Sequence, residues 1–285
     1  MKVLVTGGAG FIGSNLVRAL LERGDDVRVL DNFSTGYRSN LDGLDIEIVE
    51  GELRSYERVH NAVRGVELVF HLGALGSVPR SVQDPLTSSA VNIEGTLNVL
   101  LAARDENVRR VVYSSSSSVY GTARELPVTE ALAPDPLSPY GVAKLAAERY
   151  CVAFSRVYES FESVVVRYFN VFGPRQSPNS VYAAVIPLFI RAIDAGEPIF
   201  IDGDGEQSRD FTYVDNVVDG TLRAGLTEGV NGRIFNIAGS APATVNEVAD
   251  HIGRILGKEV KREHRPSRAG DIRASWADNT AAREA

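Results

Sequence analysis

The chain has 285 residues, of which 44% are hydrophobic and 24% are charged, proportions that are ordinary for a globular protein with a large core. Its formal net charge of −7 argues against a nucleic-acid or membrane-surface partner, because both would favour a basic face. Cys151 is the only cysteine, so no disulfide can form within the chain. The chain opens on a strand and has no apolar run near eighteen residues, which predicts a cytoplasmic protein.

The first predicted elements are a strand at residues 3–5, the run T-G-G-A-G-F-I-G and a helix at residues 14–23. Such a unit is an anion site, because the glycines let the backbone approach a pyrophosphate and the free N–H groups of the helix favour its charge. The strand and helix on either side disfavour the alternative, a tight turn without a ligand. The residues predicted to bind a dinucleotide here are Gly7, Gly10, Phe11, Ile12 and Gly13.

The second predicted strand, residues 27–30, ends on Asp31. A carboxylate at this place accepts hydrogen bonds from the adenosine ribose and would repel a 2′-phosphate, which favours NAD over NADP. Two more strands are predicted at residues 46–49 and 66–70, and His71 after the latter is interpreted as a buried structural histidine. The further cofactor contacts expected in the loops after these strands are Asn32, Ser34, Gly36, Glu52, Leu53, Leu72 and Ala74.

A strand at residues 108–113 leads into five serines, and a helix at residues 138–158 opens with S-P-Y-G-V-A-K. Tyr140 and Lys144 are four residues apart, so both lie on one face of that helix. A free tyrosine has a pKa of about 10, and a neighbouring ammonium group favours its phenolate form. The pair could therefore exchange a proton with a substrate hydroxyl. The alternative, an ordinary amphipathic surface, is disfavoured once a dinucleotide site is present in the same chain.

After a sixth strand at residues 164–167, the alternation of strands and helices breaks. The pattern predicts an α/β fold, a Rossmann-type doubly wound parallel sheet with a smaller, interleaved C-terminal substrate domain. The NAD-binding domain is expected over residues 1–169 with 210–240 returning to it, and the nucleotide-sugar domain over 170–209 and 241–285. Arg209 is either a diphosphate ligand or half of a surface ion pair. No spacing typical of metal ligands is present.

Together, T-G-G-A-G-F-I-G, the serines before V-Y-G, S-P-Y-G-V-A-K and R-Y-F-N-V-F-G-P-R resemble the extended short-chain dehydrogenase/reductases. The resemblance covers essentially the whole chain and is closest to the NAD-dependent nucleotide-sugar 4-epimerases. It implies that Tyr140 takes the proton of the sugar 4-hydroxyl while the C4 hydride passes to NAD⁺. The 4-keto sugar then rotates in the pocket and takes the hydride back on its other face. It also implies that Ser116 binds the 4-oxygen, that Lys144 binds the nicotinamide ribose and that Ser114 contacts the cofactor.

Residues 74–81 and 175–187 are similar to those of bacterial UDP-N-acetylglucosamine 4-epimerases rather than the strict glucose/galactose ones. This resemblance implies interconversion of UDP-N-acetylglucosamine and UDP-N-acetylgalactosamine, with UDP-glucose and UDP-galactose as further possible substrates. Ser275 stands where glucose-restricted bacterial epimerases carry a tyrosine, and its small side chain leaves room for an N-acetyl group. By this resemblance, Arg268 holds the diphosphate and Asp271 the uridine ribose. The other implied substrate contacts are Gly76, Ser77, Ser116, Ser117, Asn170, Gln176, Ala184 and Arg209.

Several alternatives stay open: a UDP-glucose 4-epimerase, a UDP-glucuronate 4-epimerase and a non-catalytic NAD-binding regulator. Sugar dehydratases and decarboxylases of this type carry an acidic residue before V-Y-G, where this chain has only serines. The two long helices at residues 88–104 and 138–158 are expected to form a four-helix bundle in a homodimer, unless they pack only on the sheet. Glu52 stands where the family usually has Asp. The chain also ends before the family's terminal helix, so the sugar domain is expected to be truncated at its C-terminus.

Overall fold

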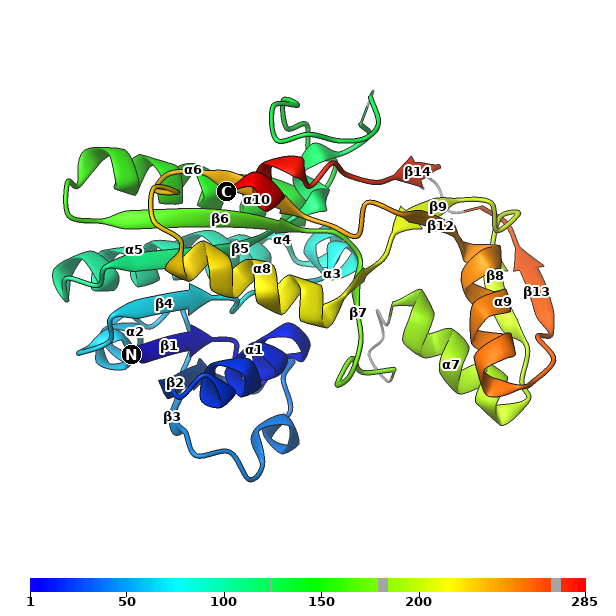
Figure 1. The fold of residues 1–285 in the computed structure, drawn as a ribbon, viewed down its shortest axis with the longest axis horizontal. Helices are drawn as coiled ribbons and strands as arrows, with labels where there is room; N and C mark the ends of the chain where they lie inside the picture. Colours follow the sequence, from blue (N-terminus) through cyan, green and yellow to red (C-terminus); the bar gives the residue numbers. More distant parts are fainter. Residues whose placement is uncertain (124, 179–183, 268–272) are drawn as a thin grey trace.

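The computed structural model describes residues 1–123, 125–178, 184–267 and 273–285 (Figure 1). A seven-stranded sheet with the order β11-β6-β5-β4-β1-β2-β3 forms its centre, and every neighbouring pair is parallel. The predicted Rossmann-type sheet is confirmed. Its strands are β1 (Lys2–Thr6), β2 (Asp26–Asp31), β3 (Glu47–Glu50), β4 (Leu68–His71), β5 (Arg110–Ser116), β6 (Glu162–Tyr168) and β11 (Ile234–Ile237).

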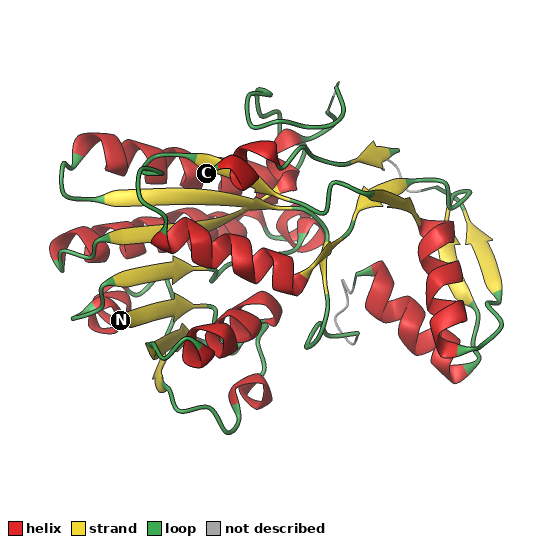
Figure 2. Cartoon of the chain, viewed as in Figure 1, coloured by secondary structure: helices red, strands yellow, loops and turns green. Residues whose placement is uncertain are grey.

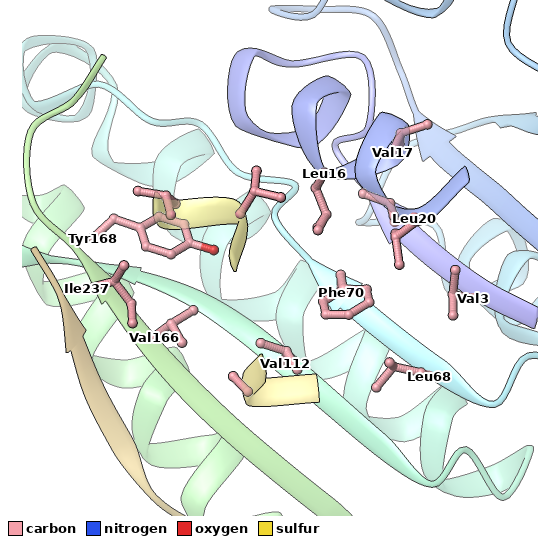
Figure 3. Close-up of a cluster of buried hydrophobic side chains, with 14 of the residues drawn as sticks. Val3, Leu16, Val17, Leu20, Leu68, Phe70, Val112, Val166, Tyr168 and Ile237 are labelled. Atoms are coloured by element: carbon pink, nitrogen blue, oxygen red, sulfur yellow. The ribbon is translucent and has the colours of Figure 1, made fainter. Parts of the chain in front are cut away.

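Helices cover both faces of this sheet (Figure 2). On one face α1 (Phe11–Glu22) and α8 (Val214–Leu226) pack over the sheet, and Figure 3 shows Leu16 and Leu20 of α1 beside Phe70 of β4. On the other face lie α2 (Tyr56–Val63), α5 (Gly95–Asp105) and α6 (Pro139–Val157). Successive strand residues point to opposite faces, so runs of apolar residues such as those of β1 serve both cores.

The helix predicted at residues 88–104 is longer than expected and contains a widened turn. α3 (Val78–Gln83) and α4 (Pro85–Ser89) come first, and a π-helical turn, η2 (Ala90–Glu94), joins α4 to α5. Single π-turns inside helices are frequent at functional sites. The Thr96 side chain, just after this turn in α5, donates to the carbonyl of Asn92 within it at 2.7 Å. The turn thus places the Asn92 side chain where it can hydrogen-bond to the loop after β4, as described below.

A smaller group of elements has its own apolar cluster, with Phe189, Ile201 and Ile252 among its buried members. It consists of α7 (Val185–Ala195), α9 (Val245–Leu256), β8 (Ile199–Asp202) and β13 (Arg262–Arg265), the last two forming a parallel pair. These elements lie at the far end of the molecule from the N-terminus (Figure 1).

Short strands lie between the large sheet and this smaller group (Figure 1). β9 (Ser208–Asp210) is the middle strand between β12 (Pro242–Thr244) and β14 (Ala274–Ser275), and β7 (Val171–Phe172) pairs with β10 (Thr212–Tyr213). These strands of two or three residues were not predicted, because so short a segment shows no periodicity. The remaining elements are η1 (Arg38–Leu41), η3 (Ser117–Tyr120) and α10 (Thr280–Glu284). In the described ranges, no helix combines the length and apolar character needed to cross a bilayer.

Candidate active site

The turn between β1 and α1 has the geometry that its glycines predict. Gly7 has a φ of +71°, a conformation that favours glycine. A Cβ at Gly13 would lie 2.2 Å from the Gly7 carbonyl oxygen, so no side chain fits where the turn meets the helix. Gly10 is the residue that precedes α1, and Phe11, Ile12 and Gly13 form its first turn. The backbone is therefore open to a close approach by a phosphate group.

Asp31 organises the loops around this turn. Its carboxylate is buried and accepts hydrogen bonds from the backbone N–H of Ala9 at 2.9 Å and of Phe33 at 2.8 Å. The loop after β2 folds back onto the same turn, because the Tyr37 N–H donates to the Ala9 carbonyl at 3.0 Å. Gly36 fits there only without a side chain, since a Cβ would lie 2.7 Å from the Ala9 carbonyl carbon. Each carboxylate oxygen keeps further acceptor capacity for ribose hydroxyls.

These elements enclose a cavity of about 120 Å³ at the carboxyl ends of β1, β2 and β4. Parallel α/β sheets bind ligands at this edge, where the strand order reverses. The cavity is lined by ten of the residues predicted to bind the cofactor: Gly7, Gly10, Asp31, Asn32, Ser34, Gly36, Glu52, Leu53, Leu72 and Ala74. A side-chain-free turn beside a carboxylate fits a pyrophosphate and its neighbouring ribose.

His71 is buried at the end of β4, as expected of a structural histidine. Its Nδ1 lies 2.7 Å from Thr6 Oγ1 and its Nε2 lies 3.0 Å from Thr96 Oγ1. Thr6 Oγ1 also accepts from the Gly73 N–H at 3.0 Å. Burial, and then the charge of Lys144, lower the pKa of His71 to about 3, so its ring is neutral at physiological pH. The ring joins three elements beneath the loop that lines the cofactor cavity.

Ser116, Tyr140 and Lys144 converge at the carboxyl end of β5. Ser138 caps α6 by accepting from the Gly141 N–H at 3.1 Å, which places Tyr140 in the first helical turn. The Tyr140 phenol is hydrogen-bonded to Ser116. Lys144 is buried, and its Nζ donates to the Ser114 carbonyl at 2.8 Å. The three residues predicted to be catalytic are thus brought to one place by β5 and α6.

The ionisation of the tyrosine and lysine reflects their burial. Burial raises the pKa of Tyr140, and the hydrogen bond from Ser116 lowers it in part. Burial lowers the pKa of Lys144 to about 8, and the nearby Glu148 carboxylate opposes that change. Lys144 therefore loses its proton more readily than an exposed lysine, whereas Tyr140 holds its proton more tightly than an exposed tyrosine. A cationic nicotinamide ring bound nearby would further favour the phenolate.

A second cavity of about 500 Å³ lies between α7, β8 and β9. Three residues predicted to contact the substrate line it: Asn170, Ala184 and Arg209. Asn170 has a φ of +31° and its side chain donates to the Asp210 carbonyl at 3.3 Å, which ties it to β9. Arg265 stacks over the ring of Phe200 in the same lining, at 3.6 Å from the ring centroid. The cavity offers both apolar and cationic contacts.

The other predicted substrate residues that the structure describes are absent from the linings of both cavities. Ser77 caps α3, Ser117 begins η3, and the Gln176 side chain donates to the Val171 carbonyl at 3.1 Å. At Gly76 a Cβ would meet nothing within 4 Å, so this backbone faces open space. Ser275 lies in β14, in parallel register with Arg209 of β9. Arg268 and Asp271 lie outside the described residues.

Two residues near the site were not predicted. The Asn92 side chain accepts from the Leu75 N–H at 2.8 Å and donates to the Leu75 carbonyl at 3.2 Å, fixing the loop after β4. Asp210 is buried and accepts from the N–H groups of Gly239, Ser240 and Ala277 at 2.8, 3.1 and 3.2 Å. For Asn92, the available signal was an asparagine between the apolar residues Val91 and Ile93. The contacts of Asp210 join residues that are distant in sequence, so the sequence held no signal for its role.

The sequence matches the model of the NAD dependent epimerase/dehydratase family over residues 3–238. The chain belongs to this family. It is 39% identical to a UDP-glucose 4-epimerase of Mycolicibacterium smegmatis, over 100% of the chain and 92% of that relative. A UDP-N-acetylglucosamine 4-epimerase from Methanobrevibacter ruminantium, solved with UDP-N-acetylmuramic acid, is 39% identical with a TM-score of 0.94, over 98% of this chain and 90% of the other.

A UDP-glucose 4-epimerase of Thermus thermophilus, solved with NAD, is 34% identical with a TM-score of 0.92, over 100% of this chain and 92% of the other. The predicted family, the extended short-chain dehydrogenase/reductases, is confirmed, and so is NAD as the cofactor. The predicted enzyme class, an NAD-dependent UDP-sugar 4-epimerase and hence an isomerase, is confirmed as well. Within the described residues, no three His, Cys, Asp or Glu side chains are grouped to hold a metal ion.

Proposed function

We propose that the chain interconverts UDP-N-acetylglucosamine and UDP-N-acetylgalactosamine at C4 and also accepts UDP-glucose and UDP-galactose. One observation carries this proposal. Ser275 of β14 is in register with Arg209 of β9, and Arg209 lines the larger cavity. A serine at this position leaves the volume that a 2-acetamido group needs, whereas a tyrosine would occupy it.

The chemistry assigned to the chain's own groups is proton transfer at one hydroxyl. Tyr140 removes the proton of the sugar 4-hydroxyl and returns it after the 4-keto sugar has rotated in the site. Ser116, which is hydrogen-bonded to the Tyr140 phenol, also holds the sugar 4-oxygen in place. Lys144 lies one helical turn further along and stabilises the phenolate by its charge. NAD, when bound, supplies the acceptor and donor of the C4 hydride.

The remaining substrate contacts are part of the same proposal. Arg209 and Arg268 are assigned to the diphosphate from opposite sides, and Asp271 to the uridine ribose. Gly76, Ser77, Ser117, Asn170, Gln176 and Ala184 are assigned to the sugar. The larger cavity, which Asn170, Ala184 and Arg209 line, combines the apolar and cationic walls expected of a site for a nucleotide sugar.

The proposed domain boundaries separate the residues that bind the cofactor from those that bind the substrate. Residues 1–169, with 210–240 returning to them, form the NAD-binding domain in this proposal. Residues 170–209 and 241–285 form the nucleotide-sugar domain, with α7 and α9 packed on their own apolar cluster. Cytoplasmic location fits an enzyme that uses nucleotide sugars.

The alternatives differ in what they require at the sugar. A strict UDP-glucose 4-epimerase requires something other than residue 275 to close the acetyl pocket. A UDP-glucuronate 4-epimerase requires a cation near the sugar C6, and none of the predicted sugar contacts is cationic. A regulator without activity would not need Ser116, Tyr140 and Lys144 together. The acetylated substrate is therefore the proposal that uses the most features of the site.

Ser275→Tyr is the variant that tests this proposal. The added ring should lower kcat/KM for UDP-N-acetylglucosamine by at least about tenfold, while kcat/KM for UDP-glucose stays within about threefold. Ser275→Ala should keep the preference of the parent chain, because it adds no volume. Equal losses on both sugars in Ser275→Tyr would show that the position does not discriminate the acetyl group, and would count against the proposal.

A further inference from the structure

A buried polar network lies behind the catalytic serines, between β5, β6 and α6. Glu148 is fully buried, and its carboxylate accepts from Ser115 Oγ at 2.5 Å and from Arg167 Nε and Nη2 at 2.9 and 2.7 Å. Arg167 also donates to the Tyr120 hydroxyl at 2.7 Å, and that hydroxyl donates to Asn236 Oδ1 at 2.7 Å. The two opposite charges are therefore paired in a bidentate geometry and anchored to a third strand, β11.

The position of this network relative to the catalytic residues follows from the residue spacing on α6 and from the pairing register of β5 with β6. Tyr140, Lys144 and Glu148 are spaced by four residues, so they lie along one face of α6. Ser115 is the direct partner of Arg167 in the parallel pair of β5 and β6, and both side chains contact Glu148. Ser115 stands between Ser114, whose carbonyl binds Lys144, and Ser116, whose hydroxyl binds Tyr140.

Stability alone does not account for such a network. The surrounding core is apolar and includes Ala147, Cys151 and Val165. Burying a carboxylate and a guanidinium costs several kcal/mol in desolvation, and well-packed apolar residues often serve stability equally well. A fully satisfied buried network instead permits one relative orientation of the elements it joins. Here those elements are the helix and the strand that carry the catalytic residues.

We propose that Glu148 and Arg167, with Ser115, are positioning residues that fix the rotation of α6 against β5 and so align Tyr140 and Lys144 with Ser116 and Ser114. This role rests on the epimerase reaction proposed above. Proton transfer is sensitive to such alignment, since a displacement of about 1 Å in a reacting group can cost about 100-fold in rate. None of the three residues is assigned a contact with the sugar or with NAD.

The charge of Glu148 adds a second effect on Lys144. Besides the Ser114 carbonyl, the described groups that interact with the lysine are Glu148 and Cys151 on α6, the Tyr113 ring on β5 at 4.9 Å, and His71 on β4. Burial lowers the pKa of Lys144, and the charge of Glu148 opposes that change. Glu148→Gln should therefore move the lysine-dependent limb of the pH–rate profile to lower pH. A purely structural residue would leave that limb in place.

The chain contains a matched control. Arg110 is as buried as Arg167 and lies on the same strand pair at its opposite end. It donates to Glu162 Oε2 at 2.7 Å and to the carbonyls of Ala224 and Thr227. Arg110→Lys therefore removes the contacts of an equally buried guanidinium, whose partner Glu162 is partly exposed, far from the catalytic residues. Replacement by lysine keeps the charge in both variants and removes the bidentate geometry.

The test compares Arg167→Lys, Arg110→Lys and Ser115→Ala in the full chain, using the UDP-hexose that the parent chain epimerises fastest. Arg167→Lys should lower kcat about 10- to 100-fold while KM and the Kd for NAD stay within about threefold. Ser115→Ala should show the same split to a smaller degree, which keeps the test available if Arg167→Lys does not fold. Arg110→Lys should lower the unfolding temperature but retain kcat.

The role would be overturned if folded Arg167→Lys or Ser115→Ala kept the parent kcat, or if Arg110→Lys lost kcat to the same degree. It would also be overturned by a rise in KM with kcat retained, since that pattern indicates lost substrate binding. The comparison does not depend on the acetyl preference, because it uses whichever sugar is turned over. An inactive parent chain would instead overturn the proposed function, and this role with it.

Discussion

Tyr140 is the residue on which the assigned chemistry depends. Its position in the first turn of α6 is set by the Ser138 cap and by its own N–H, which donates to Ser81 Oγ at 3.1 Å. The phenol is bonded to Ser116, and its pKa is raised by burial. The hydroxyl is therefore protonated before NAD and substrate bind at neutral pH, and it needs the positive charges around it to act as a base.

Tyr140→Phe removes this hydroxyl with little change in shape. We expect kcat to fall by about 1,000-fold, because general acid–base catalysis contributes about 10²- to 10⁴-fold, while NAD binding is retained. Tyr56→Phe is the control, since that tyrosine lies on α2 and donates to Asp105 at the surface. The measurement is kcat together with a binding titration of NAD. A variant that binds NAD and retains turnover would show that another group moves the proton.

At the scale of elements, His71 connects β1, β4 and the helix that follows the π-turn. Its neutral ring is bonded to Thr6 and Thr96, and its folded pKa of about 3 lies below the value of about 6.5 for an unfolded histidine. As the pH falls below about 6.5, the unfolded chain binds a proton that the folded chain refuses. The free energy of unfolding should therefore decrease as the pH falls from about 6.5 towards about 3.

The size of this decrease is about 1.4 kcal/mol per pH unit for one histidine once the pH is well below 6.5. Urea unfolding of the parent chain and of His71→Gln between about pH 7 and pH 5 measures it. The variant should show a shallower pH dependence, whatever its stability at neutral pH. His251→Gln, at an exposed position on α9, should keep the slope of the parent chain. Equal slopes in all three would contradict the assignment of a neutral, buried His71.

At the scale of the whole molecule, several exposed apolar side chains lie on α3, α4 and α6. The most exposed are Leu86, at 83%, and Val157, at 70%, and Val82, Val142 and Tyr150 are also exposed. The homodimer predicted through a four-helix bundle of residues 88–104 and 138–158 stays a proposal, and these exposed side chains, on α6 and on α3 and α4 at or just before the start of the first segment, support it. Two helices from each subunit would bury these residues, as apolar stripes on paired helices require.

Leu86→Glu tests this interface. A carboxylate at the centre of an apolar interface should shift the chain from dimer to monomer, as measured by light scattering after size-exclusion chromatography. Ile255→Glu is the control, because Ile255 is 82% exposed but lies on α9. A parent chain that is monomeric at all concentrations, or a Leu86→Glu variant that stays dimeric, would contradict the proposed dimer.

Local patterns in the sequence predict the parts of the fold that local physics determines. The strands and helices of the large sheet, the glycine turn and α6 follow from periodicity, turn chemistry and capping. β5 is longer than predicted, because residues 114–116 continue the pairing with β6. Serines rarely mark a strand, so only the tertiary context reveals this extension.

Contacts between distant segments account for the features that the sequence did not predict. The register of Ser275 with Arg209, the carboxylate of Asp210 and the pairing of Glu148 with Arg167 each join residues whose proximity depends on the completed fold. The identity of the candidate site residues was accessible through motifs. Their mutual orientation was not, because it depends on packing between elements far apart in the sequence.

The most direct test of the proposed function is epimerisation of UDP-N-acetylglucosamine and UDP-glucose by the NAD-loaded chain, measured side by side with the product sugars resolved by chromatography. We predict formation of UDP-N-acetylgalactosamine at a rate equal to or above that of UDP-galactose, because Ser275 leaves room for the acetamido group. Conversion of UDP-glucose alone would contradict the substrate proposal while leaving the assigned proton transfer intact.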